Sequence, residues 1–338
     1  MTFMYDEAAT SHMVVTRQLQ ENGSAIEALR DSLAADPPSI VAVCGRGSSG
    51  HAALYLRYVL ETRLGILTTS ILPSTSSVFT RWPSVPHGLC VTISQSGHSA
   101  DLLAVVEGMK RNGTRSVALV NDTSSPLAEL SQFVIPILAG DELSVAATKS
   151  FIGSLFASLQ LVNSIKPGTI PETQLTMLPG LLKRAWTLDW THLIDNLVNA
   201  RGLYVIGRGS GLAIAGEAAL KFKETCGLHA EAYSAAEVRH GPMALFKKDF
   251  PVLIFRQQDE SAASIDEIAT LAVEHGCKVF VVGGATKGAI NLEAIHAPAL
   301  LEPMLQIQSF YRAVNDLSLR RGRDPDRPPF LQKVTVTK

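Results

Sequence analysis

Three charged residues between positions 217 and 224 have the spacing of neighbours on one face of a helix. Glu217, Lys221 and Glu224 lie four and then three residues apart in GEAALKFKETC, so a helix places their side chains on the same side. A desolvated carboxylate there can act as a base, and a nearby ammonium can stabilise an oxyanion or form a Schiff base. Salt bridges on a solvated face are the alternative, but the segment is otherwise apolar, which favours a cleft.

A histidine downstream of these charges is a further candidate for acid and base chemistry. His240 lies in VRHGP, and histidine exchanges protons near neutral pH. A histidine before Gly-Pro is more often an ordinary loop or core residue. Both interpretations stay open at the level of the residue alone.

A serine-rich turn is the strongest candidate for binding an anion. In TISQSGHSADLL, Ser94, Gln95, Ser96 and Ser99 crowd the start of an expected helix near Ala100. Hydroxyls and free N–H groups at a helix N-terminus form a site for a phosphate monoester. Serines are also common helix caps, but one cap needs one serine. The turn lacks the lysine of a nucleotide P-loop.

A glycine-rich turn precedes it in the chain. GRGSSG contains Gly45, Arg46, Gly47 and Ser48, and its G-x-G-x-x-G pattern is also found in dinucleotide-binding turns. Such a site needs an acidic residue after the second strand, yet the expected strand GILTTSI is followed by LPSTSS. The pattern therefore disfavours NAD. Because ligands collect beyond the carboxyl ends of parallel strands, we expect this turn and the serine turn to share one phosphate pocket.

The elements that must position these residues are predicted from an alternation of apolar strands and helical segments. Parallel strands need crossovers, usually helices, so the order predicts parallel sheets between helices. Aligning VAVCGRGSSG with LYVIGRGSGL places Gly45 on Gly207, which indicates two copies of one unit. The predicted fold class is α/β, with two tandem subdomains, each a doubly wound, flavodoxin-like sheet. The expected parts are helices at 1–38, subdomains at 39–170 and 171–322, and a tail at 323–338.

The composition limits the classes of partner and compartment. The 338 residues include 30 Lys and Arg against 31 Asp and Glu, without a basic cluster, so a nucleic-acid partner is not expected. The four cysteines lack metal-binding spacing and are expected to be reduced core thiols. No signal peptide and no membrane span are predicted. We therefore expect a cytoplasmic protein without membrane contact.

Several motifs together resemble the SIS (sugar isomerase) family, in particular the isomerase half of glucosamine-6-phosphate synthase. They are CGRGSSG, SQSGHSADL, ELSVAATKSF, GEAALKFKE, HAEAYSAAEVRHGPMAL and the terminal LQKVTVTK, and they span residues 44 to 338. The resemblance implies two SIS subdomains, a small sugar phosphate as substrate, and a homodimer that shares its active site. It implies no cofactor and no metal.

The resemblance also implies roles for individual residues. Glu224 would move a proton between C1 and C2, Lys221 would interact with the ketose carbonyl, and His240 of the neighbouring subunit would open the ring. Lys333 would close over the sugar, and Val145 and Ala147 would line the pocket. The phosphate would be bound by Ser94, Gln95, Ser96 and Ser99 beside Gly45, Arg46, Gly47 and Ser48.

Two departures from the synthase bear on the reaction. We expect no glutaminase domain, and Thr2 stands where the synthase has cysteine. Arg46 and Ser48 lie in a turn whose sequence differs from that of the synthase. The pattern resembles a second type of glucosamine-6-phosphate deaminase, which forms fructose 6-phosphate and ammonia. Another phosphosugar aldose-ketose isomerase, a galactosamine-6-phosphate deaminase, a fructosamine-6-phosphate deglycase and a non-catalytic sugar-phosphate sensor remain as alternatives. A sensor need not keep Lys221, Glu224, His240 and Lys333 together.

Overall fold

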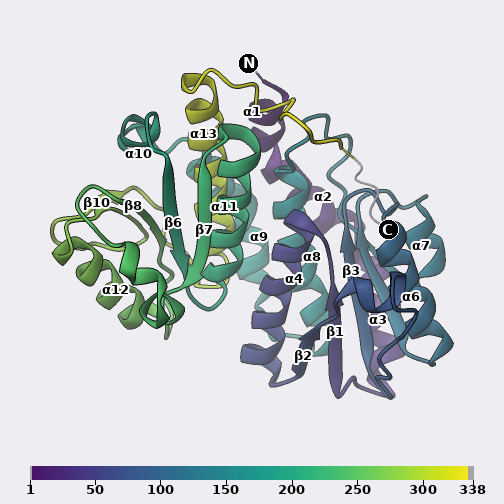
Figure 1. The fold of residues 1–338 in the computed structure, drawn as a ribbon. Coiled ribbons are helices and arrows are strands. Elements are labelled where there is room, and N and C mark those ends of the chain that lie inside the picture. The colour runs from purple at the N-terminus through teal and green to yellow at the C-terminus, as the bar shows by residue number, and fades with distance from the viewer. Residues whose placement is uncertain (1, 334–338) are drawn as a thin grey trace. The chain divides into compact units, whose positions relative to one another are not determined.

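Two five-stranded sheets organise the chain, and each has helices on both faces (Figure 1). The computed structural model describes residues 2–333. Of these residues, unit 1 comprises 2–10, Leu143–Thr148 and Leu178–Leu331, and unit 2 comprises Ser11–Glu142, Lys149–Met177 and 332–333. Each unit is therefore assembled from three separate stretches of chain.

The sheet of unit 2 is entirely parallel. Its strands are rich in β-branched and other apolar residues, and helical crossovers join them, as parallel neighbours require. Cys44 is paired in register with Thr92, which places the carboxyl ends of two central strands side by side. The strand order is β2 (Leu67–Ser70), β1 (Ile40–Cys44), β3 (Leu89–Ser94), β4 (Arg115–Val120), β5 (Phe133–Pro136).

Helices cover both faces of this sheet. On one face Leu102, Val105 and Met109 pack against Ala42 and Cys90 of the strands. The helices of unit 2 are α2 (Ser11–Glu21), α3 (Gly23–Ala34), α4 (Gly47–Val59) with a π-helical continuation (Leu60–Leu64), α5 (Pro73–Ser77), α6 (Ala100–Arg111), α7 (Pro126–Leu130) and α8 (Lys149–Ile165).

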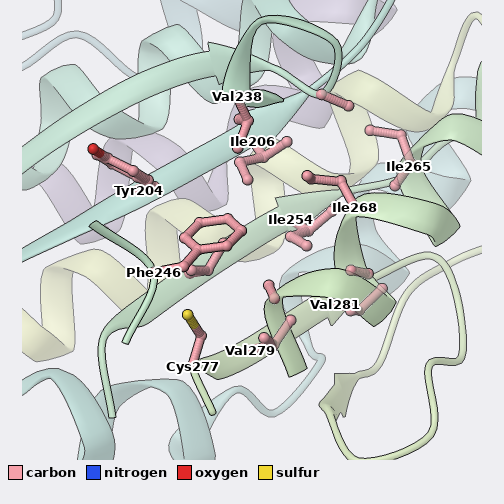
Figure 2. Close-up of a cluster of buried hydrophobic side chains, with 14 residues drawn as sticks. Tyr204, Ile206, Val238, Phe246, Ile254, Ile265, Ile268, Cys277, Val279 and Val281 are labelled. Atoms are coloured by element: carbon pink, nitrogen blue, oxygen red, sulfur yellow. The ribbon is translucent and has the colours of Figure 1, made fainter. Parts of the chain in front are cut away.

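The sheet of unit 1 repeats the same order of strands. From one edge to the other it contains β7 (His229–Ser234), β6 (Gly202–Gly207), β8 (Pro251–Phe255), β9 (Lys278–Val282) and β10 (Ile290–Leu292), all parallel. Ile206 and Ile254 point from the strands toward Ile265 and Ile268 of α12 (Ala262–Glu274), and all four side chains are fully buried (Figure 2). This cluster forms the core on one face of the sheet.

The other face of the unit 1 sheet packs against α11 (Gly211–Cys226) and α13 (Glu302–Arg320). The rings of Phe222 and Phe310 meet edge to face at 5.0 Å, and Phe255 of β8 lies 6.2 Å from Phe310. The remaining elements are α1 (Phe3–Ala9), α9 (Glu172–Trp186), α10 (Thr191–Leu197) and the 3-10 helices η2 (Glu237–His240) and η3 (Pro242–Leu245).

The N-terminal helix α1 belongs to unit 1 and is held by a residue near the other end of the chain. The Asp326 carboxylate accepts hydrogen bonds from the backbone N–H groups of Phe3 and Met4, both at 2.7 Å. A carboxylate at a helix N-terminus satisfies donors that have no partner within the helix.

The predicted repeat is confirmed by both sequence position and geometry. Gly45 directly follows β1, and Gly207 ends the equivalent strand β6. A Cβ atom at Gly45 would lie 2.5 Å from the Ser49 carbonyl oxygen, and one at Gly207 would lie 2.3 Å from the Gly211 carbonyl oxygen. Only glycine allows this close approach of the turn to the helix behind it. The order 2-1-3-4-5 in both sheets is that of the flavodoxin-like doubly wound fold, so the predicted fold class is confirmed.

The sequence predicts a long helical stretch from about residue 174 to 200, and the structure divides it into two helices. α9 ends at Trp186 and α10 begins at Thr191, because Asp189 accepts hydrogen bonds from the Thr191 N–H at 2.8 Å and from its hydroxyl at 2.6 Å. Such a local turn competes with the helix. Over residues 2–333, none of the helices combines the length and the apolar character that crossing a bilayer demands.

Candidate functional site

The turns after β1 and β3 lie at the point where the strand order of the unit 2 sheet reverses. The chain leaves β1 for β2 on one side and returns to β3 on the other. Open α/β sheets bind ligands at such switch points. α4 begins at Gly47 and α6 at Ala100, so each turn ends at a helix N-terminus, where N–H groups and the helix dipole attract an anion.

The serine turn is shaped by its own hydroxyl groups. Ser94 Oγ accepts a hydrogen bond from the Gly97 N–H at 2.9 Å, and Ser96 Oγ accepts one from the His98 N–H at 3.3 Å. An accepting hydroxyl keeps its hydrogen for a further acceptor. Ser99 occupies the N-cap position of α6, yet its side chain makes no capping bond. The hydroxyl of Ser99 is therefore not used in the way the capping interpretation expects.

Arg46 links the glycine turn to the serine turn through Asp101. Arg46 Nε and Nη2 lie 2.7 Å and 2.5 Å from Asp101 Oδ2, and the Asp101 side chain is only 1% exposed, against 49% for Arg46. The buried carboxylate fixes the guanidinium and offsets part of its charge. Asp101, in the first turn of α6, was not among the predicted site residues. Its position two residues after Ser99 could have indicated that Asp101 lies near the serine turn. The sequence does not show that its carboxylate contacts Arg46.

Lys221 is buried between two carboxylates on α11. Its Nζ lies 2.5 Å from Glu224 Oε2 and 3.4 Å from Glu217 Oε1. The Lys221 and Glu217 side chains are 1% and 0% exposed, and that of Glu224 is 21% exposed. The predicted helical face is therefore confirmed as buried, and the alternative of salt bridges on a solvated face is excluded.

The charge state of Lys221 follows from its partners. Burial alone lowers the pKa of Lys221, but the charges and hydrogen bonds of Glu217 and Glu224 outweigh it, and the pKa is raised. The lysine is thus held as an ammonium ion, which suits stabilisation of an oxyanion better than attack as a free amine. Within the cluster, Glu224 is the carboxylate open to solvent.

His240 is an exposed residue of unit 1. It ends the 3-10 helix η2, immediately before Gly241, whose φ of 136° turns the chain. Its side chain makes no hydrogen bond or ion pair with any part of residues 2–333. No described hydrogen bond or ion pair joins His240 to Glu224, and its predicted role stays a prediction.

The segment that carries Val145 and Ala147 is fixed in unit 1 by its backbone. The Glu7 carboxylate of α1 accepts hydrogen bonds from the N–H groups of Leu143 and Ser144, and the Val145 N–H donates to the Asp326 carbonyl at 3.3 Å. Val145 and Ala147 are half-buried, in alternation with buried neighbours. Glu7 was not foreseen as a residue that positions this segment.

Lys333 belongs to unit 2 and is paired with a buried acid. Its Nζ lies 3.4 Å from Glu142 Oε2, and the hydroxyl of Ser150 donates to the same oxygen at 2.5 Å. Glu142 was not predicted. The tail that was expected to close the site continues beyond Lys333, and positions 334–338 lie outside the described residues. In the described part of the chain, no group of three or more His, Cys, Asp or Glu is arranged to hold a metal.

A repeated, doubly wound α/β unit with a serine turn at one switch point defines the class of protein. The model of the SIS domain matches residues 38–164 and 196–315, one copy over each sheet. The chain belongs to the SIS domain family, as its motifs predict, and it has the phosphosugar isomerase fold of that family.

Known proteins similar to this chain agree with that assignment. The glutamine–fructose-6-phosphate aminotransferase (isomerizing) of Sulfurisphaera tokodaii is 30% identical over 95% of this chain and 56% of its own length. The chain spans about half the length of the curated relatives it matches. A candidate phosphosugar isomerase of Silicibacter pomeroyi is 40% identical, with a TM-score of 0.91 over 96% of this chain and 100% of that one.

A glucosamine-6-phosphate deaminase of Thermotoga maritima has the same fold at lower similarity. It is 23% identical, with a TM-score of 0.75 over 97% of this chain and 100% of that chain. At this level of identity the likeness concerns the architecture alone.

Proposed function

We propose that this protein is an amino-sugar-phosphate deaminase that converts glucosamine 6-phosphate and water into fructose 6-phosphate and ammonia. The observation that carries the proposal is the Glu224 carboxylate, partly open to solvent and 2.5 Å from a buried ammonium. A carboxylate in this setting can remove a proton from carbon, while the adjacent cation stabilises the negative charge that develops on oxygen.

The reaction divides into steps that these groups can perform. Once the ring opens, C1 is an aldehyde and C2 carries the amine. Glu224 removes the proton at C2 and returns it at C1. The C1 oxygen gains a proton and the amine nitrogen loses one, so that C1 becomes a hydroxymethyl group and C2 a ketimine. Water adds to the ketimine, and ammonia leaves. Lys221, held as an ammonium, would stabilise the oxygen at C1 while the proton is transferred.

Phosphate anchoring is assigned to the turns after β1 and β3. Ser94, Ser96 and Ser99 offer hydroxyl hydrogens, two helix N-termini offer N–H groups, and Arg46 offers a positive charge. Ring opening is assigned to His240 from the neighbouring subunit of a homodimer. An exposed histidine with no described side-chain partner is available for such a role.

The decisive experiment is turnover of three substrates by the full chain. The purified protein is incubated with glucosamine 6-phosphate, galactosamine 6-phosphate and a fructosamine 6-phosphate, and ammonia and ketose phosphate are measured. We expect ammonia and fructose 6-phosphate from glucosamine 6-phosphate. Binding of every substrate with turnover of none would refute the proposal in favour of a sugar-phosphate sensor.

The role of Glu224 is tested by a single substitution with a matched control. Glu224→Gln keeps the size of the side chain and should reduce turnover by about 10²-fold or more, because the general base is lost. Calorimetric binding of the sugar phosphate should persist. Glu274→Gln, at an exposed position near the end of α12, should leave turnover unchanged. Full activity of Glu224→Gln would show that the base is another residue.

A second candidate function is interconversion of an aldose phosphate and a ketose phosphate without loss of nitrogen. The 40% identity to a candidate phosphosugar isomerase favours it. The same proton transfer between C1 and C2 serves both reactions. Conversion of an aldose 6-phosphate to its ketose, with no ammonia from any amino sugar, would select this alternative.

A further inference from the structure

A tyrosine from α13 completes the buried cluster on α11. Tyr311 is fully buried, and its Oη donates a hydrogen bond to Glu217 Oε1 at 3.0 Å. The same oxygen lies 3.4 Å from Lys221 Nζ, which in turn lies 2.5 Å from Glu224. A continuous chain of polar contacts thus runs from Tyr311 to the carboxylate assigned as the base.

We infer that Tyr311 is a positioning residue for proton transfer, acting on Glu224 through Glu217 and Lys221. The inference rests on the proposed function, since it assigns Glu224 as the base. Glu217 is fully buried and cannot be stabilised by water. A phenol that donates to a carboxylate favours its ionised form, and charge-assisted bonds of this kind are about twice as strong as neutral ones.

The ionised Glu217 in turn determines where the ammonium lies. Lys221 is flanked by two carboxylates, and its position between them sets the geometry it offers to Glu224. If Glu217 accepts a proton, the charge attraction on that side of Lys221 is lost, while the contact of the ammonium with Glu224 remains. The charged and titratable groups joined by the described contacts of this cluster are Glu217, Lys221 and Glu224 from α11 and Tyr311 from α13.

The first test is a double-mutant cycle that needs no substrate. Tyr311→Phe and Glu217→Gln are made singly and together, and each protein is unfolded in urea at pH 7. We expect Tyr311→Phe to raise the unfolding equilibrium constant by about tenfold or more in the wild-type background, the worth of a bond to a charged group. In the Glu217→Gln background most of this effect should disappear.

A matched tyrosine provides the control for the cycle. Tyr233 Oη also donates to a carboxylate, Glu231 Oε2 at 2.9 Å, but on the partly exposed strand β7. Tyr233→Phe and Glu231→Gln should show little coupling, because water replaces the lost bond. Equal coupling in both pairs, or none for Tyr311 with Glu217, would overturn the inference.

The second test separates a positioning role from a purely structural one. In Tyr311→Phe the acid limb of the kcat/KM profile should move to higher pH by about one unit, because Glu217 takes up a proton more readily. KM for the sugar phosphate should stay within about twofold. An unchanged profile with a positive cycle would make Tyr311 structural only. If the wild-type protein turns over no substrate, the proposed function fails and the cycle still decides whether Tyr311 holds Glu217.

Discussion

Replacing Lys221 by methionine removes the ammonium of the α11 cluster and keeps an unbranched side chain. The change leaves Glu217, which is fully buried, without the cation 3.4 Å away. Breaking a buried ion pair in this way typically costs about 3–5 kcal/mol. Glu217 can limit that loss by accepting a proton, and at pH 7 protonating a glutamate of ordinary pKa, about 4.3, costs about 3.7 kcal/mol. We therefore expect a loss of about 3–4 kcal/mol in the free energy of unfolding at pH 7.

The pH dependence of this loss identifies its cause. In the variant, the folded state binds a proton at Glu217 at pH values where the unfolded glutamate is ionised, so stability falls as pH rises. Relative to wild type, the loss should shrink by about 1.4 kcal/mol per pH unit on acidification, to about 1 kcal/mol at pH 5. Glu224 contributes less than Glu217 to this pH-dependent loss of stability, because its carboxylate is partly exposed to water.

Urea unfolding followed by tryptophan fluorescence measures the effect, since Trp186 and Trp190 belong to the same unit as Lys221. Lys223→Met, at the exposed neighbouring lysine, should change stability by no more than about 0.5 kcal/mol. Adding Glu217→Gln to Lys221→Met should restore most of the loss. A loss that does not vary between pH 7 and pH 5, or one that Lys223→Met reproduces, would refute the reasoning.

Two further predictions concern unit 2. Because the Ser99 side chain makes no capping bond, Ser99→Ala should leave thermal stability unchanged. The same substitution should weaken sugar-phosphate binding, measured by calorimetry, by about tenfold. A stability loss of about 1 kcal/mol with unchanged affinity would instead show that the Ser99 side chain is a helix cap. Burial raises the pKa of both Cys44 and Cys90 to about 12. The folded protein at pH 8 should therefore leave both thiols unmodified by a thiol-specific disulfide reagent, and urea should expose them; labelling of either without urea would contradict this.

The fold was predictable because each parallel crossover is visible in local sequence. The apolar runs at 39–44 and 202–206 are too short for helices and are followed by glycine turns and helical segments, and both became central strands with equivalent turns. The helical spacing of Glu217, Lys221 and Glu224 likewise predicted a shared face. The break between α9 and α10 was missed, since it depends on the hydrogen bonds that one side chain, Asp189, makes in the folded chain.

The contacts that complete the candidate sites were not predictable from one sequence. Asp101 contacts an arginine 55 positions away, and Tyr311 contacts a glutamate 94 positions away. Periodicity shows which face of a helix is buried, but it does not show which side chain of another element lies opposite. Side chains that contact each other over such long sequence separations show no characteristic spacing in the sequence.

The hydrogen bonds between α1 and Asp326 have a consequence for the order of folding during synthesis. The carboxylate that receives the first N–H groups of α1 is made 323 residues after Phe3. At translation rates of about 5–20 residues per second, the delay is roughly 15–65 s. Throughout that time α1 lacks these two hydrogen bonds, so a chaperone or a protease meets the helix without the contacts that hold it in the finished protein.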